Sequence, residues 1–287
     1  MKIRKSLKIG KPAVKGGILV LFGIFNSRVG IGVEIFTKNL IYGPLAYLFL
    51  GLSGIIIIKL LQILENSTYK GILSKKKALI ISEVLYLIGF ILTIINVIEN
   101  MIIYYFNIVL IFFTFFIGFL WSLLGFYGYK RKIKVSYISI LLVSLIFSIG
   151  LIYGVFLNSF IISIYIYFFF FSTLFLQLSR ELMKGFNVDD INEGFIGLDN
   201  RTSQDKVLKV SLFLQISSIV FLILPISLFV SYSILYLALM ISSIFFISLA
   251  GILTLESILE RKISYKISSI LKIGILFELL SLLIIGS

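Results

Sequence analysis

Residues 40–64 read LIYGPLAYLFLGLSGIIIIKLLQIL and contain one charged side chain, that of Lys59. A helix needs about 20 apolar residues to cross a bilayer core about 30 Å thick. This stretch exceeds that length, and a helix satisfies the backbone polar groups that lipid cannot satisfy. We therefore predict a transmembrane helix here.

The rest of the chain is similarly apolar, with 60% hydrophobic and 14% charged residues among 287. This composition is too apolar for a soluble globular domain. The hydrophobic runs have the length of spanning helices and lack the short alternation of barrel strands. The sequence therefore predicts an all-α polytopic membrane protein. Nine spans are expected, at residues 16–36, 40–64, 78–97, 101–129, 137–157, 160–178, 210–230, 234–255 and 267–285.

The segments between these spans alternate in basic charge. From the N-terminus onward they hold six, one, four, none, four, none, five, none, three and no Lys or Arg residues. Because cytosolic loops carry the excess of Lys and Arg, the alternation supports nine spans with a cytoplasmic N-terminus and an outside C-terminus. We expect a single domain, 1–287, integral to the cell membrane. Its polar cytosolic loops are predicted at residues 65–77, 130–134, 179–209 and 256–266.

Composition also excludes several kinds of chemistry. The chain has no Cys and no His, which excludes disulfides, thiolate and imidazole metal sites and Cys or His nucleophiles. The net charge of +13 is spread in short clusters between apolar runs, so membrane topology explains it and no nucleic-acid partner is expected. The paired broken helices of transporters are also not evident. Any metal ion must bind oxygen ligands.

An acidic segment stands out, because six of the thirteen carboxylates fall between residues 181 and 205. The preceding residues 179–184 read SRELMK, and helical spacing puts Arg180 and Lys184 on one face. Two cations one turn apart suit a phosphate or diphosphate, and the following Asp189 and Asp190 suit Mg²⁺. The alternative is a basic helix end followed by a solvated loop.

Two other basic clusters have the same ambiguity. Residues 127–132 read YGYKRK and residues 70–77 read KGILSKKK. Both clusters suit an anionic headgroup or a diphosphate. The alternative is that they bind no ligand, because aromatic belts at the membrane interface and cytosolic loops have the same composition. Charges within the predicted spans are costly in lipid and normally face a partner or a polar cavity. These charges are Arg28, Glu34, Lys59, Glu83, Lys272 and Glu278.

Taken together, these motifs resemble those of the UbiA superfamily of intramembrane prenyltransferases. SRELMK is similar to the Arg-Glu-apolar-apolar-Lys-Asp opening of that family's second acidic motif, particularly in its archaeal digeranylgeranylglyceryl phosphate synthase branch. YGYKRK resembles the Tyr-rich end of the family's fourth span. KGILSKK resembles the family's loop after the second span, except that the two prolines of that loop are missing here. The resemblance covers almost the whole chain and implies nine helices around a central lipid-accessible cavity.

The resemblance also implies a function and a site. A polyprenyl diphosphate would be bound with Mg²⁺ and its prenyl group transferred to a lipid or aromatic acceptor, with apolar spans and membrane lipid around the tail. The substrate-binding residues would be Lys59, Lys70, Lys130, Arg131, Arg180 and Lys184, and the metal ligands Asp189 and Asp190.

The first acidic motif of that family, Asn-x-x-x-Asp-x-x-x-Asp, is missing. Its three positions correspond to Ile55, Lys59 and Ile63. In the second acidic motif, the Asp expected after Lys184 is replaced by Gly185. Each ~1.4 kcal/mol of lost transition-state stabilisation slows a reaction tenfold. We therefore expect reduced, altered or absent activity, with the ammonium of Lys59 replacing part of the missing positive charge. The alternative is a non-catalytic isoprenoid-lipid-binding protein or complex subunit.

Overall fold

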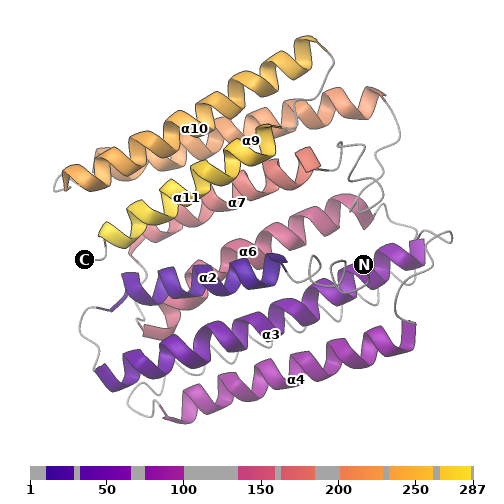
Figure 1. The fold of residues 1–287 in the computed structure, drawn as a ribbon, viewed down its shortest axis with the longest axis vertical. Helices are drawn as coiled ribbons and strands as arrows, with labels where there is room; N and C mark the ends of the chain where they lie inside the picture. The colour runs from indigo at the N-terminus through magenta and orange to yellow at the C-terminus, as the bar shows by residue number, and fades with distance from the viewer. Residues whose placement is uncertain are drawn as a thin grey trace. The chain divides into compact units, whose positions relative to one another are not determined.

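The computed structural model of the protein describes eight segments of the chain, and every regular element within them is an α-helix (Figure 1). The segments are residues 11–28, 33–65, 75–99, 135–158, 163–184, 201–228, 233–260 and 266–285. Their helices are α2 (Lys11–Asn26), α3 (Val33–Glu65), α4 (Lys75–Glu99), α6 (Val135–Asn158), α7 (Ile164–Lys184), α9 (Arg201–Leu228), α10 (Ile234–Leu259) and α11 (Ile267–Ile285).

By length and composition, six of these helices can cross a membrane. Their spanning segments are Val33–Ile57, Lys77–Asn96, Ile140–Asn158, Asp205–Ile226, Ile234–Leu259 and Ile267–Ile284. The chain is thus an all-α, polytopic, integral membrane protein, as its composition predicts. The predicted span 101–129 lies outside the described residues, so the count of nine helices stays a prediction.

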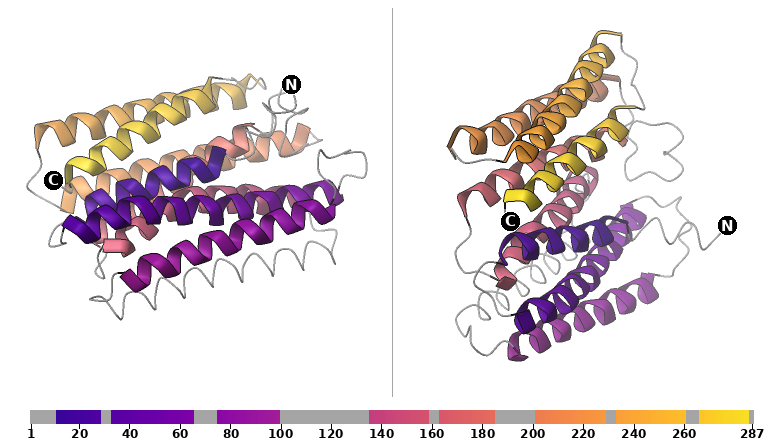
Figure 2. Two further views of the ribbon diagram at one scale, coloured as in Figure 1. Left: turned by 60° about the horizontal axis from the view of Figure 1, so that its bottom comes forward. Right: turned by 60° about the vertical axis from the view of Figure 1, so that its left-hand side comes forward.

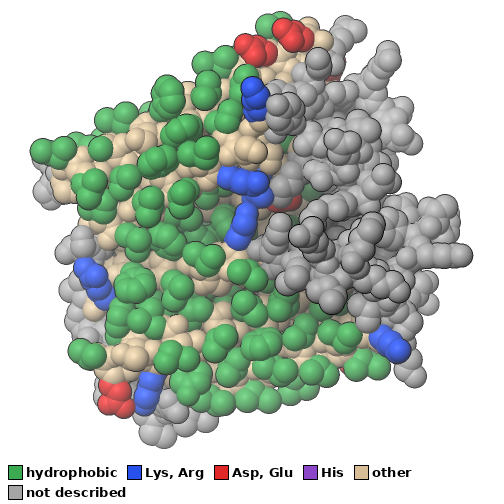
Figure 3. Space-filling model, in the orientation of Figure 1, with side chains coloured by type: hydrophobic (Ala, Val, Ile, Leu, Met, Phe, Trp, Pro, Cys, Tyr) green, Lys and Arg blue, Asp and Glu red, His purple; other side chains and the backbone are tan. Residues whose placement is uncertain are grey.

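The outer surface of the described helices is strongly apolar. Phe213, Ile241 and Phe245 are 67%, 64% and 61% exposed, which would be unfavourable on a soluble protein. Figure 3 shows one face of the molecule, where hydrophobic side chains cover the helices and most charged side chains lie toward helix ends. This distribution fits helices whose outer faces contact lipid.

The first predicted span is wrong in its extent. Residues 16–36 were expected to form one helix, but α2 ends at Asn26 and α3 begins at Val33. The backbone N–H of Ser27 donates to the carbonyl of Gly23 at 3.1 Å, and the Ser27 hydroxyl donates to the same oxygen at 2.8 Å. The helix therefore ends at the consecutive polar residues Asn26, Ser27 and Arg28, where the serine hydroxyl competes with the backbone for a helix carbonyl.

The predicted loop 179–209 is also partly helical. Helix α7 continues to Lys184, beyond the expected end at residue 178, and α9 begins at Arg201, before the expected residue 210. The predicted span ends where the apolar run ends, at the first charged residues. A helix can continue beyond that point when its polar side chains have partners. Residues 185–200 lie outside the described residues.

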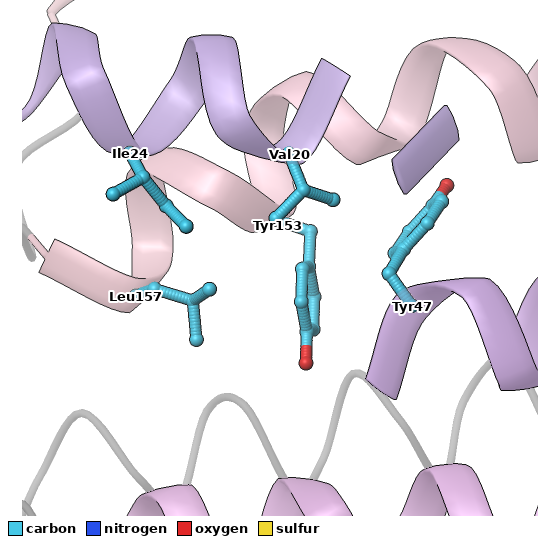
Figure 4. Close-up of a cluster of buried hydrophobic side chains, with 5 residues drawn as sticks. All are labelled: Val20, Ile24, Tyr47, Tyr153 and Leu157. Atoms are coloured by element: carbon cyan, nitrogen blue, oxygen red, sulfur yellow. The ribbon is translucent and has the colours of Figure 1, made fainter. Parts of the chain in front are cut away.

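The chain divides into two compact units, of which the first is Met1–Ile162. Helix α3 packs against α2, α4 and α6, and α2 also packs against α6 (Figures 1 and 2). Figure 4 shows the buried cluster where α2, α3 and α6 meet, formed by Val20, Ile24, Tyr47, Tyr153 and Leu157. The rings of Tyr47 and Tyr153 lie 5.3 Å apart, and the Tyr47 hydroxyl donates to the carbonyl of Ile146.

One end of this unit is tied by two buried asparagines. Asn39 of α3 donates to the carbonyl of Leu157 at 2.8 Å and to Oδ1 of Asn158 at 2.7 Å. Asn158 in turn donates to the carbonyl of Ile24 at 2.8 Å. The two amides therefore join α2, α3 and α6 by hydrogen bonds between different helices.

Replacing Asn39 by leucine is expected to lower the free energy of unfolding by about 1–3 kcal/mol, because buried acceptors lose their donor. The midpoint of thermal loss of monodisperse protein in detergent would measure the effect. Thr37→Val is the control, since exposed Thr37 bonds to Val33 within its own helix and to no other described residue. Equal midpoints for the two variants would contradict a role for Asn39 in joining the helices.

The second unit is Ser163–Ser287 and contains α7, α9, α10 and α11. Helix α7 packs against α9 and α11, and α10 packs against the same two helices. Each helix thus contacts two neighbours around a shared interior. That interior contains many of the buried polar side chains described next.

Candidate functional site

A stripe of buried polar side chains runs along α7. Its members are spaced so that they recur on one side of a 3.6-residue helix, and each is at most 5% exposed. Because this side faces the neighbouring helices of the second unit, the stripe must find polar partners there. The side chains are Ser172, Thr173, Gln177, Ser179 and Arg180.

Arg180 forms a polar triad with Gln177 and Glu181 at the C-terminal end of α7. Its Nη1 donates to Oε1 of Gln177 at 2.7 Å and lies 3.6 Å from Oε1 of Glu181. The amide of Gln177 donates to the same Glu181 oxygen at 2.8 Å. Gln177 and Glu181 therefore hold one side of the guanidinium in a fixed direction, although the side chains come from a single helix.

The triad leaves one donor of Arg180 unused. Nε is buried and has no hydrogen-bond partner among the described residues, while the Arg180 side chain is only 6% exposed. An arginine side chain remains charged at neutral pH and offers donors that match phosphate oxygens. A buried, oriented and incompletely paired guanidinium of this kind suits a ligand oxygen with negative charge.

A second network joins this end of α7 to its neighbours. The hydroxyls of Ser179 and Ser211 lie 2.6 Å apart. Gln215 of α9 donates to Ser179 at 2.9 Å and to Thr254 of α10 at 3.2 Å. Three helices are thereby connected one residue before Arg180, which restricts the direction in which the guanidinium can point.

The sequence-predicted residues are only partly placed. Arg180 and Lys184 lie one turn apart in α7, so the predicted helical spacing is confirmed, and Lys59 belongs to α3. For Lys59 and Lys184 the structure describes the helical backbone and not the side chain. Five predicted site residues lie wholly outside the described residues, and their roles stay predictions. These residues are Lys70, Lys130, Arg131, Asp189 and Asp190.

The described residues alone do not fit a Mg²⁺ site. No three acidic side chains gather among them, and Mg²⁺ requires oxygen ligands in a near-octahedral arrangement. The one carboxylate of α7, Glu181, already accepts from Gln177 and faces Arg180. In α3, Ile55 is fully buried where the family resemblance expects the first residue of the metal-binding motif.

The charges predicted within spans have different surroundings. Glu278 of α11 is fully buried and accepts a hydrogen bond from Thr173 at 2.9 Å. Glu34 pairs with Lys38 at 3.1 Å on the exposed first turn of α3. Arg28 lies just after α2 rather than within it. Glu83 and Lys272 are exposed on α4 and α11.

Sequence reasoning missed the neutral partners of these charges. Gln177, Thr173 and Gln215 are each at most 1% exposed and bond to charged or polar side chains. In α7 the signal was present as a repeat of polar residues at helical spacing. For Gln215 no local signal exists, because its partners Ser179 and Thr254 belong to two other helices.

Comparisons with known proteins find a likeness of fold and no likeness of sequence family. No protein-family model matches the sequence, and no curated protein matches it. A solved structure, described as digeranylgeranylglyceryl phosphate synthase in membranes, is similar at 20% identity with a TM-score of 0.62. The likeness covers 99% of this chain and 98% of that chain. It shows a shared fold and confirms, at that level, the resemblance derived from the sequence motifs.

Proposed function

We propose that this chain, which has the fold of the digeranylgeranylglyceryl phosphate synthase structure, is a membrane protein that binds a polyprenyl diphosphate. The observation that carries the proposal is the buried Arg180, whose Nε lacks a partner among the described residues. A diphosphate oxygen would complete the hydrogen bonding of that guanidinium. The shared fold over nearly the full length supports the same class of ligand.

The remaining cations would extend the site. Lys184 follows Arg180 by one helical turn, and Lys59, Lys70, Lys130 and Arg131 would supply further positive charge toward the diphosphate. Mg²⁺, if bound by Asp189 and Asp190, would neutralise the leaving diphosphate, and the apolar spans would surround the isoprenoid tail. The proposed orientation in the cell membrane has a cytoplasmic N-terminus and an outside C-terminus, which puts these groups on the cytosolic side.

If transfer occurs, the role of the protein's own residues is electrostatic. A prenyl group leaves as an electrophile only when the charge developing on the diphosphate is stabilised by fixed donors in a site that excludes water. Arg180 meets that description because Gln177 and Glu181 hold it before a ligand binds. The prenyl carbon would then bond to the acceptor oxygen or carbon, and the diphosphate would depart with the electrons of the broken C–O bond. The proton displaced from the acceptor would pass to an oxygen of the released diphosphate.

The second candidate function is binding of the isoprenoid lipid without transfer. The buried Ile55 in α3 favours it, because an aliphatic side chain there cannot bind a metal. A protein of this kind would act as a carrier of a lipid diphosphate or as a subunit of a membrane complex.

Transfer of labelled geranylgeranyl diphosphate to a mixed panel of lipid and aromatic acceptors tests the proposal. The purified protein is assayed with Mg²⁺ and with chelator, beside an equilibrium binding measurement. We expect saturable binding in both conditions and slow or no product formation. Metal-dependent product would identify a transferase, whereas binding without product would identify the non-catalytic protein. Absence of saturable binding would remove both candidates.

A further inference from the structure

Glu181 lies beside the guanidinium of Arg180, and the contact between them is one of charge. Oε1 of Glu181 lies 3.6 Å from Nη1 of Arg180, which is too far for a hydrogen bond between these atoms. Nη1 instead donates to Gln177 at 2.7 Å, and the amide of Gln177 donates to the same Glu181 oxygen at 2.8 Å. The carboxylate therefore supplies negative charge to Arg180 without accepting a hydrogen bond from Nη1 or Nε.

The surroundings of this pair make its charge balance important. The side chains of Arg180 and Glu181 are only 6% and 10% exposed. Burial lowers the pKa of the Arg180 guanidinium from its ordinary value, and the carboxylate of Glu181 raises it. A buried charge that loses its partner is strongly unfavourable. Among the described residues, Glu181 supplies the salt bridge that compensates Arg180 while no ligand is bound.

A diphosphate at Arg180 would add a second anion to this arrangement. The unused donor Nε belongs to the same guanidinium, so an anionic oxygen bound there would share one positive charge with Glu181. Two negative groups that share one cation repel each other, and the repulsion is stronger where water is largely excluded. The free energy of diphosphate binding therefore contains an unfavourable contribution from Glu181.

We propose that Glu181 is the resident counterion of Arg180, and that it competes with a diphosphate for this guanidinium. The inference rests on the proposed function, because it requires Arg180 to bind the diphosphate. Glu181 weakens the binding of that ligand and favours its release. When the diphosphate has left, the pair of Arg180 and Glu181 is neutral again, so no unpaired charge stays buried.

Variants with zero, one and two carboxylates beside Arg180 test this role. Glu181→Gln removes the carboxylate with little change of shape, and Gln177→Glu adds one at the residue that accepts from Nη1. Equilibrium binding of labelled geranylgeranyl diphosphate to the purified protein, with Mg²⁺ and with chelator, measures each dissociation constant. Relative to the unmodified protein, we expect a value about 10-fold lower for Glu181→Gln and about 10-fold higher for Gln177→Glu.

A thermal measurement separates this role from a purely structural one. Without ligand, Glu181→Gln leaves the buried guanidinium unpaired, so the thermal midpoint of monodisperse protein should fall. At one fixed concentration of geranylgeranyl diphosphate, the midpoint should rise further in this variant than in the unmodified protein, because tighter binding stabilises more. A carboxylate with a merely structural role would support both properties, and its removal would lower the midpoint and the affinity together.

Glu256→Gln is the control, because it removes an exposed carboxylate of α10 and should leave the dissociation constant unchanged. If the unmodified protein binds and Glu181→Gln binds equally or more weakly, the counterion role is overturned while the proposed function stands. If Glu181→Gln does not elute as monodisperse protein, Gln177→Glu decides, and an unchanged or lower dissociation constant in that variant overturns the role. Absence of saturable binding to the unmodified protein would overturn the proposed function and the counterion role together.

Discussion

Replacing Arg180 by glutamine is expected to raise the dissociation constant for geranylgeranyl diphosphate about 10-fold to 100-fold. The guanidinium is buried, is held by Gln177 and Glu181, and keeps Nε without a partner among the described residues. A hydrogen bond to a charged group contributes about 1.5–3 kcal/mol, and ~1.4 kcal/mol changes the dissociation constant tenfold. Glutamine keeps a polar side chain but removes the positive charge that a diphosphate oxygen requires.

Equilibrium binding of the labelled diphosphate in detergent or nanodiscs measures this effect. Lys209→Gln is the matched control, because it removes one positive charge from an exposed position on α9. At physiological salt the screened charge of Lys209 should contribute little to the affinity. Arg180→Lys keeps the charge and should bind more tightly than Arg180→Gln. Equal affinities for Arg180→Gln and the unmodified protein would exclude Arg180 from the diphosphate site.

Replacing Gly154 by alanine is expected to destabilise the first unit by about 1–3 kcal/mol or more, since overpacked backbone contacts relax poorly. A Cβ at Gly154 would overlap the carbonyl oxygen of Val20 and lie 3.0 Å from the Cα of Gly23. These are backbone atoms of α2, which cannot turn aside as a side chain can. To admit one methyl group, α2 and α6 must separate, which opens the cluster of Val20, Ile24, Tyr47, Tyr153 and Leu157.

The same substitution at Gly251 of α10 is the control. A Cβ there meets Oε1 of Gln215 at 3.6 Å and Cδ1 of Leu212 at 3.9 Å, which are ordinary contacts. Alanine is the better helix former by about 0.5–1 kcal/mol, so Gly251→Ala should be neutral or stabilising. Thermal midpoints measured by size-exclusion chromatography after heating would compare the two. If Gly154→Ala unfolds at the same temperature as Gly251→Ala, close packing of α2 on α6 does not limit stability.

Much of the fold was predictable from local pattern. The spans 40–64, 78–97 and 137–157 lie within α3, α4 and α6, because long apolar runs can only be helical in lipid. Two predicted bounds differ from the structure: the single helix 16–36 is divided after Asn26, and α7 continues beyond residue 178. Ser27 bonds to the Gly23 carbonyl at the polar end of α2, and α7 continues through Arg180 and Glu181, which are paired.

The candidate site was predictable in part for the same reason. The sequence motif predicted that Arg180 and Lys184 form a pair suited to a diphosphate, since their spacing is a local property of a helix. It could not show that Arg180 is buried, because burial depends on helices that pack around it. Thr173, which donates to Glu278, lies 105 residues earlier in the chain.

The sequence by itself determined that this protein spans the membrane as helices, and which stretches of it are apolar enough to do so. It also determined the motifs that resemble a prenyltransferase. The tertiary structure alone decided that Arg180 keeps an unused donor, and that Glu278 lies fully buried with the Thr173 hydroxyl of α7 donating to it. Hydrophobicity and spacing are local, whereas the surroundings of a buried charge depend on residues far away in the chain.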